Sequence, residues 1–448
     1  MNPKSPNAIL FCRDFEPSRR ERSGALRSYL SVEGSKNTIL VYTKRKRTKL
    51  NAIILASGST IYNITCMIYR AEWINRIEHA WEEKPIVWLS GVRRVGKTFL
   101  SRSLDDIEYF DCELPRTRRF FEDPQDFLHG MREKRVVLDE IHRLSNPSEL
   151  LKISADYFPD IRILATGSST LAATSKFRDT LAGRKRNVFL TPMILPDLER
   201  FGNTGWKHRF LRGGLPPLFM AESLPERDFQ DWMDSYWAKD IQELFRLERR
   251  NSFIRFLELI LMQSGGIFEA TRFSRPCEVS RTTISNYLGV LETTLVAHVI
   301  RPYSTHRPTE IVAAPKIYGF DTGFVCAYRG WQTLRNEDMG ILWEHIVLNE
   351  LNAHSQGRLI NYWRDKRGHE IDFIIARPGK NPVAIECKWS ARDFDPAGMR
   401  SFRFQYPGGE NFVVSHDIDQ SHTRQYDKLS IRYVNPPELI SHIFSDHQ

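Results

Sequence analysis

The 448-residue sequence contains only six cysteines, and none of them forms a C-x-x-C pair. They lie singly along the chain, at Cys12, Cys66, Cys112, Cys277, Cys326 and Cys387. This spacing is typical of reduced thiols and excludes a disulfide framework and a cysteine-rich zinc site. We therefore expect a cytoplasmic protein. A chain of this length also exceeds what one hydrophobic core usually supports, so two to four domains are expected.

Excess charge is absent from most of the chain, although the whole sequence carries a formal net charge of +9. Residues 1–66 hold 12 of the 64 Lys and Arg residues but only 4 of the 55 Asp and Glu residues, which leaves a net charge of +1 for the rest. The overall charge is therefore no argument for nucleic-acid binding, which would need a local basic patch.

Residues 1–66 show neither helical nor strand periodicity and form a segment of their own. The uncharged residues 50–69 approach the length of a membrane span, but they contain many Ser, Gly, Thr and Asn residues. We interpret residues 1–66 as an artefactual upstream extension, because Met67 precedes the first amphipathic segment and would be a natural start. A basic, disordered tail and a membrane anchor are the alternatives, the anchor being the weaker. No membrane partner is expected.

The segment PIVWLSGVRRVGKTFL (85–100) fits the pattern G-x-x-x-x-G-K-[ST]. The run IVWL predicts a strand before the loop, and a helix is expected to begin near Lys97. In such a loop, backbone N–H groups surround the phosphates, the lysine contacts the β and γ oxygens, and the threonine binds Mg²⁺. We therefore predict a site for ATP and Mg²⁺, and its loop residues are Gly91, Arg94, Gly96, Lys97 and Thr98.

Further residues of this site are expected at the ends of two more strands. In KRVVLDEIHRL (134–144), the strand ends in Asp139, which is predicted to bind Mg²⁺ through water, and Glu140, which is predicted to orient or deprotonate the attacking water. The strand in IRILATGSS (161–169) leads to Ser168 and Ser169, either of which would sense the γ-phosphate. A turn of small polar residues is the equal alternative.

An arginine that offsets transition-state charge is also expected, and a neighbouring subunit often supplies it. The segment LAGRKRNVFL (181–190) offers Arg184 and Arg186, of which Arg184 is the candidate. A homo-oligomer is accordingly an expected partner. The alternative is that this segment is only a solvated basic loop.

These motifs and FLRGGLPPLF (210–219) occur in an order and at spacings that resemble a large family of prokaryotic AAA-type ATPases. The resemblance runs from about Met67 to the C-terminus. It implies an α/β fold with a P-loop, three-layer ATPase core, which we place at residues 67–235. Members of that family carry a C-terminal domain named only as a domain of unknown function, so the resemblance implies ATP binding but no biological role.

Residues 236–312 are predicted to form a winged helix. The helix FIRFLELILMQSGG precedes a helix-turn-helix pattern, in which Ser280 caps a helix and LVAHVIRPY forms the wing. The inward face of that helix would consist of Ile284, Leu288 and Leu291, and its outward face of Arg281, Thr283, Ser285 and Asn286. The outward face either enters a DNA major groove or belongs to an internal spacer, and we favour the spacer because one arginine is little positive charge for phosphate contact.

Residues 313–448 are predicted to form a restriction-endonuclease-like α/β domain. The segment NYWRDKRGHEIDFIIARPGKNPVAIECKWS (361–390) is typical of a hairpin, with Asp372 on its first strand and Glu386 and Lys388 on one face of its second. With Glu344 on a preceding helix, this arrangement resembles the PD-(D/E)XK nuclease fold. In that fold carboxylates bind Mg²⁺, and the lysine orients or activates a water.

Two neighbouring residues bear on this resemblance, one in its favour and one against it. Glu370 would share the face of Asp372 and assist it, whereas Ile371 stands where the usual motif has proline. Because the fold is often reused for binding alone, three functions remain open. They are an ATPase that drives a nuclease-like domain on DNA or, less readily, RNA; an ATP-dependent switch with a binding-only C-terminal domain; and an ATP-regulated DNA-binding protein. The intact lysine and three carboxylates favour the first.

Overall fold

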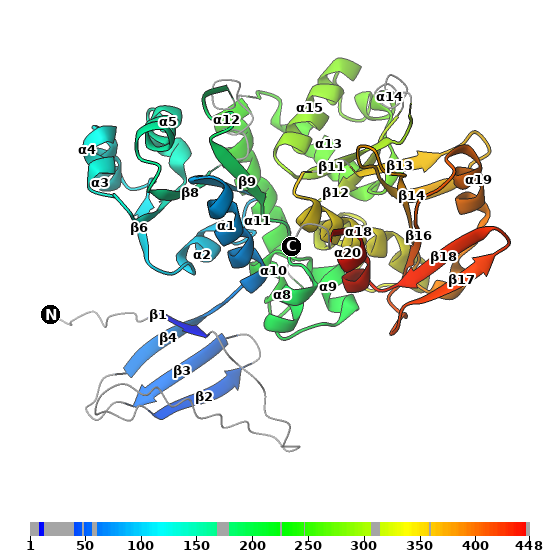
Figure 1. Ribbon diagram of the computed structural model, residues 1–448, viewed down its shortest axis with the longest axis horizontal. Coiled ribbons are helices and arrows are strands. Elements are labelled where there is room, and N and C mark those ends of the chain that lie inside the picture. Colours follow the sequence, from blue (N-terminus) through cyan, green and yellow to red (C-terminus); the bar gives the residue numbers. More distant parts are fainter. Residues whose placement is uncertain are drawn as a thin grey trace.

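The computed structural model describes residues 69–167, 179–224, 226–245, 247–305, 314–357 and 360–444, together with the backbone of strands that precede residue 69. These residues are arranged around three β-sheets (Figure 1). In the part of the chain so described, no helix is both long enough and apolar enough to cross a membrane.

Five parallel strands form the sheet of the predicted ATPase core, in the order β6-β7-β8-β5-β9. Their bounds are β5 Ile86–Ser90, β6 Ile107–Asp111, β7 Arg135–Asp139, β8 Arg162–Thr166 and β9 Lys185–Phe189. The carboxyl ends of β5, β7 and β8 share one edge because the strands are parallel. The residues that follow β5 therefore meet the last residues of β7 and β8 at this edge.

Helices cover both faces of this sheet, so the core has three layers. Alternate strand residues enter two separate apolar clusters, as the two-residue period of a strand requires. One cluster includes Val87 and the buried face of α1, and the other includes Trp88 and residues of α4 and α5. The helices of this region are α1 Ala71–Glu83, α2 Lys97–Arg102, α3 Pro115–Arg118, η1 Arg119–Phe121, α4 Pro124–His129, η2 Ile141–Arg143 and α5 Pro147–Tyr157.

A run of helices follows the sheet and leads to the C-terminal half. They are α8 Leu195–Arg200, α9 Trp206–Arg212, α10 Pro216–Phe219, α11 Glu226–Tyr236, the π-helix η3 Trp237–Gln242 and α12 Glu243–Phe245. α11, η3 and α12 form one continuous rod, which Figure 1 shows between the two halves of the molecule.

The predicted helix-turn-helix segment consists of α13 Arg250–Met262, α14 Ala270–Ser274 and α15 Arg281–Thr293. The Ser280 hydroxyl accepts a hydrogen bond from the backbone N–H of Thr283 at 3.1 Å and so caps α15. The three residues that were expected to face inward from this helix, Ile284, Leu288 and Leu291, are all buried. These helices pack beside β10 Gly266–Ile267, β11 Ala297–Pro302 and β12 Lys316–Gly319.

A nine-stranded mixed sheet joins the region of the expected wing to the last domain. Its order is β10-β12-β11-β13-β14-β15-β16-β18-β17. β11 pairs antiparallel with β12 and parallel with β13, so the boundary expected at residue 312 lies between two strands of one sheet. The remaining strands are β13 Ile360–Arg364, β14 Glu370–Ile375, β15 Val383–Cys387, β16 Asn411–Val414, β17 His422–Tyr426 and β18 Leu429–Val434.

The helices of the last region pack against strands of this sheet. They are α17 Thr322–Tyr328, α18 Asn336–Ser355, η4 Ala391–Asp393, α19 Ala397–Gln405 and α20 Pro436–Phe444. α18 is the longest of those described and is buried along much of its length, including the polar residues His345, Asn349 and Glu350. Buried polar groups need hydrogen-bond partners, and several of these partners lie in the ATPase core.

The first 68 residues contain regular structure that the sequence did not predict. Strands β1 Ile9–Cys12, β2 Leu40–Lys46, β3 Lys49–Leu55 and β4 Ile61–Ile68 form a sheet in the order β1-β4-β3-β2. β2, β3 and β4 pair as successive antiparallel strands. The alternative of a disordered tail did not include these strands, and the interpretation of residues 1–66 as an upstream extension stays a prediction.

Candidate functional site: the P-loop edge and a buried carboxyl cluster

The loop after β5 requires glycine at its two ends. A Cβ atom on Gly91 would lie 2.5 Å from the backbone oxygen of Leu190, and Gly96 has a φ of 106°, which L-residues with side chains rarely adopt. Between them, Arg94 is exposed at the tip of the loop, with a φ of 62°. The Lys97 ammonium folds back onto the loop and donates to the carbonyls of Gly91 at 2.8 Å and Val92 at 3.3 Å.

Asp139 is the centre of the hydrogen bonds at this edge. Its carboxylate accepts a bond from the Thr98 hydroxyl at 2.9 Å, from the Tyr109 hydroxyl at 2.5 Å and from the Thr166 hydroxyl. A hydroxyl and a carboxylate side by side are oxygen ligands of the kind that Mg²⁺ prefers, so Thr98 and Asp139 fit the predicted metal role. No sequence pattern identified Tyr109 and Thr166 as residues of this site.

Glu140 lies beside this group in an unusual backbone conformation. Its φ of 55° and ψ of 45° are left-handed, and its backbone N–H donates to the Thr166 hydroxyl at 3.0 Å. Burial raises the pKa of the Glu140 carboxyl, but the neighbouring His142 and the charges of Lys97 and Arg93 outweigh burial and lower the pKa to about 2. The carboxylate is therefore ionised throughout the neutral range, as a group that orients water must be.

One of the predicted residues lies away from this edge, and another falls outside the part of the chain that the structure describes. Ser168, like Ser169, lies outside the described residues. Arg184 lies just before β9, whose first residue pairs with Ile86 at the start of β5, so Arg184 is at the edge of the sheet opposite the P-loop. There it forms a two-bond ion pair with Asp156, at 2.6 and 3.1 Å. Arg184 cannot serve the nucleotide site of its own chain without a large movement.

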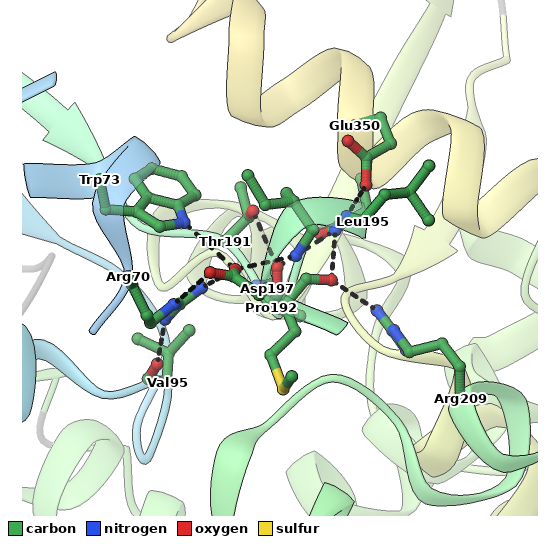
Figure 2. Close-up of polar contacts among 12 residues, drawn as sticks. Arg70, Trp73, Val95, Thr191, Pro192, Leu195, Asp197, Arg209 and Glu350 are labelled. Carbon is green, nitrogen blue, oxygen red and sulfur yellow. Dashed lines mark hydrogen bonds and ion pairs between the residues drawn. The ribbon is translucent and has the colours of Figure 1, made fainter. Parts of the chain in front are cut away.

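A buried arginine connects the P-loop to the following elements (Figure 2). Arg70 forms two bonds to Asp197, at 3.0 and 2.6 Å, and its third nitrogen donates to the backbone oxygen of Val95 at 3.0 Å. Two residues before Asp197, the backbone N–H of Leu195 donates to Glu350 of α18 at 2.9 Å (Figure 2). The P-loop is therefore tied through one polar network to the C-terminal half.

A second group of charged residues is buried in the nine-stranded sheet. β14 and β15 are antiparallel with Phe373 opposite Ile385, so the next pair outward is Asp372 and Glu386, on one face. Lys388 donates to Glu386 at 2.9 Å, and the backbone N–H of Cys387 donates to Asp372 at 2.8 Å.

Glu344 of α18 completes this carboxyl cluster together with two residues that were not predicted. The hydroxyl of Tyr318 donates to Glu344 at 2.6 Å, and Lys316 forms an ion pair with Glu370. Burial and the charge of Asp372 raise the pKa of Glu344 to about 7, against the opposing charge of Lys316. Burial and Asp372 likewise raise the pKa of Glu386. The two lysines supply positive charge at the place where a metal ion was expected.

The cluster does not have the geometry of a ready metal site. Among the described residues, no three His, Cys, Asp or Glu side chains are arranged so that they could hold a metal ion. The predicted metal ligands Glu344, Asp372 and Glu386 therefore lie in one neighbourhood, but their role in metal binding stays a prediction.

Three models of known protein families match successive segments of the chain. Residues 83–198, which include the whole P-loop edge, match a family model described as an AAA domain. The chain carries an AAA domain. Residues 203–335 and 339–433 match two further models, each described only as a domain of unknown function. The parallel sheet around the AAA domain's P-loop is thus the core of a P-loop ATPase domain, and the two later segments have no described activity.

Two relatives match most of the chain, and their names describe no function either. The chain is 28% identical over 377 residues to the uncharacterized protein Rv2008c of Mycobacterium tuberculosis and, equally, to the uncharacterized protein Mb2031c of Mycobacterium bovis. Each match covers 79% of this chain and 84% of the relative. Among solved structures, the Walker-type ATPase PABY2304 of Pyrococcus abyssi is 16% identical, with a TM-score of 0.39 over 58% of this chain and 96% of that one.

Proposed function

We propose that this chain is a Mg²⁺-dependent ATPase in which the AAA domain binds and hydrolyses ATP. The observation that carries the proposal is the meeting of Thr98, Asp139 and Glu140 at the edge of the sheet where the P-loop lies. Bound Mg²⁺ would offset the negative charge of the phosphates, and Thr98 and Asp139 would hold it.

The other residues of the edge have separate tasks in this proposal. Lys97, which now donates to the Gly91 and Val92 carbonyls, would turn to the β and γ oxygens of the nucleotide. Glu140, ionised and held by its bond to Thr166, would orient the attacking water. Arg184 would act only on the site of a neighbouring subunit, after leaving Asp156.

Nucleotide binding tests the first step. ATP affinity is measured by isothermal titration in the presence of Mg²⁺, for the full chain and for Lys97→Ala. We expect the substitution to lower the affinity about 10²-fold, because it removes a charge-assisted contact to the phosphates. Equal affinity of the two proteins would contradict the assignment of the P-loop.

A second candidate function concerns the carboxyl cluster. We propose that residues 313–448 form a nuclease-like domain acting on nucleic acid, with Lys388 as its catalytic lysine beside Glu344, Asp372 and Glu386. The neighbourhood of Asp372, Glu386 and Lys388 on one face of the sheet favours it. The helix-turn-helix segment before it, with Arg281, Ser285 and Asn286 exposed on α15, would be a winged helix that binds DNA or spaces the two domains.

Cleavage of DNA and RNA tests this second function. The full chain is incubated with each nucleic acid and Mg²⁺, with and without ATP, beside Lys388→Ala. Cleavage by the unsubstituted chain that disappears in Lys388→Ala would support the nuclease. If neither nucleic acid is cut, the nuclease proposal is contradicted, and an ATP-dependent switch with a binding-only C-terminal domain becomes the better account.

A further inference from the structure

The rod formed by α11, η3 and α12 contacts the nucleotide edge of the AAA domain at three points. Arg93 of the P-loop forms an ion pair with Asp240 of η3 at 2.7 Å, and its backbone oxygen accepts a bond from the Trp232 indole at 2.9 Å. Arg143, which follows the Asp139–Glu140 pair, forms an ion pair with Glu243 at 3.0 Å.

Arg93 is close enough to the phosphate end of the site to act on it electrostatically. It lies inside the loop between Gly91 and Gly96 that would surround the phosphates, four residues before Lys97. The ion pair is mostly shielded, since the side chains of Arg93 and Asp240 are 25% and 19% exposed. A shielded ion pair is weakly screened by salt, so breaking it has an energetic consequence that an exposed pair would lack.

The same rod also contacts the helix-turn-helix segment and Phe320, the residue after β12. Trp232 stacks on Phe320, with ring centroids 5.1 Å apart, and the hydroxyls of Tyr236 and Thr294 lie 2.6 Å apart. Trp237, the first residue of η3, packs against Phe253 of α13. The rod therefore lies between the P-loop and the helix-turn-helix segment, in contact with both.

The rod is also irregular at the point of contact. Residues Trp237–Gln242 form a π-helix, a conformation that is rare and occurs frequently at functional sites. Asp240, the partner of Arg93, lies inside it.

We propose that Arg93 is a phosphate-sensing residue, which exchanges Asp240 for the terminal phosphate of bound ATP and so passes the nucleotide state to the rod. The inference rests on the proposed ATPase function. A planar guanidinium binds phosphate through charge-assisted bonds as readily as it binds a carboxylate, so ATP competes with Asp240 for Arg93. ADP lacks the terminal phosphate and leaves the ion pair intact. Differential contact of this kind is what lets a ligand shift a conformational equilibrium.

The first readout is the ratio of ATP affinity to ADP affinity, measured for the full chain with a non-hydrolysable ATP analogue and with ADP. Arg93→Ala should reduce the ratio about tenfold, mainly through weaker binding of the analogue. Asp240→Asn should change it in the opposite direction, because Arg93 is then released from its competitor. Arg93→Lys should restore part of the ratio. A merely structural role for the pair would weaken binding in both variants.

The second readout is amide hydrogen exchange over residues 232–245. In the unsubstituted chain, protection of this segment should fall with the ATP analogue and not with ADP, whereas Asp240→Asn should be poorly protected with either. Glu243→Gln is the matched control: it removes the other ion pair to the same rod, and should leave the affinity ratio unchanged.

The outcomes separate the inference from the ATPase proposal. Failure of the unsubstituted chain to bind either nucleotide would reject the proposed function itself. Nucleotide binding with the same affinity ratio in Arg93→Ala and Asp240→Asn, or equal exchange with the analogue and ADP, would overturn the inference alone. Should Arg93→Ala fail to fold, as judged by its melting curve, Asp240→Asn and Arg93→Lys decide the question.

Discussion

Asp139 shows which residues of the site a sequence can reveal. Thr98 and Asp139 were predictable because each belongs to a local pattern, a glycine-rich loop or an apolar strand that ends in carboxylates. Tyr109 and Thr166 bond to the same carboxylate but come from β6 and β8, which only the strand order places beside β7. Their one sequence signal is position at or near the end of an apolar strand, which is too common to single them out.

Buried charge was the other feature that residue patterns could not predict. Lys316 and Tyr318 contact the carboxyl cluster from β12, 54 and 26 residues before their respective partners Glu370 and Glu344. A lysine on a short strand normally indicates a solvated face. Here the lysine is buried, because the three carboxyls that act on it, Glu344, Glu370 and Asp372, favour its charged form.

Glu350 supplies a prediction about pH and stability. Burial raises the pKa of its carboxyl to about 8, from an ordinary value near 4.3. The folded chain therefore binds the proton more tightly than the unfolded chain, so the contribution to stability is complete below about pH 4 and is lost as the pH rises toward 8. Glu350→Gln keeps an oxygen for the Leu195 N–H and cannot ionise.

Melting temperatures measured at pH 5.5 and pH 8 check this. We expect the unsubstituted chain to lose about 2–4 °C more than Glu350→Gln between these pH values. Glu337→Gln is the control, because Glu337 is exposed on the same helix α18. Identical pH dependence in Glu350→Gln and the unsubstituted chain would show that Glu350 does not carry the buried proton.

At the scale of the element, the sequence predicted structure within contiguous segments better than it predicted pairing between distant segments. The strands of the P-loop edge, the Ser280 cap of α15 and the hairpin of β14 and β15 all lie within contiguous segments, so periodicity and turn residues specify them. The parallel pairing of β11 with β13 joins residues 60 apart, and it is set by packing rather than by any local pattern. That pairing is why the expected domain boundary at residue 312 falls inside one sheet.

The π-helix η3 is a further element without a sequence signal. The segment YWAKDIQELF (236–245) has the periodicity of an ordinary amphipathic helix. Its extra-wide turn brings Asp240 to Arg93 while Trp237 and Ile241 remain buried. The periodicity of the sequence therefore does not distinguish this π-helical turn from an ordinary α-helix.

In the whole molecule, the AAA domain is bound to the later segments by polar and apolar contacts at several points. Glu350 of α18 accepts a hydrogen bond from Leu195 at the start of α8, and the rod of α11, η3 and α12 packs between the P-loop and α13. Such contacts would give ATP binding a physical means of affecting the C-terminal half. In the proposed ATPase, Glu140 drives hydrolysis at a site that Lys97 and Thr98 make competent to bind ATP.

The most direct test of that claim is Mg²⁺-dependent phosphate release from ATP by Glu140→Gln, measured together with ATP affinity. Glutamine keeps the shape of the side chain and removes the carboxylate that orients water. We expect an affinity within about threefold of the unsubstituted chain and a turnover lower by about 10²-fold or more. Turnover at the unsubstituted rate in Glu140→Gln would contradict it.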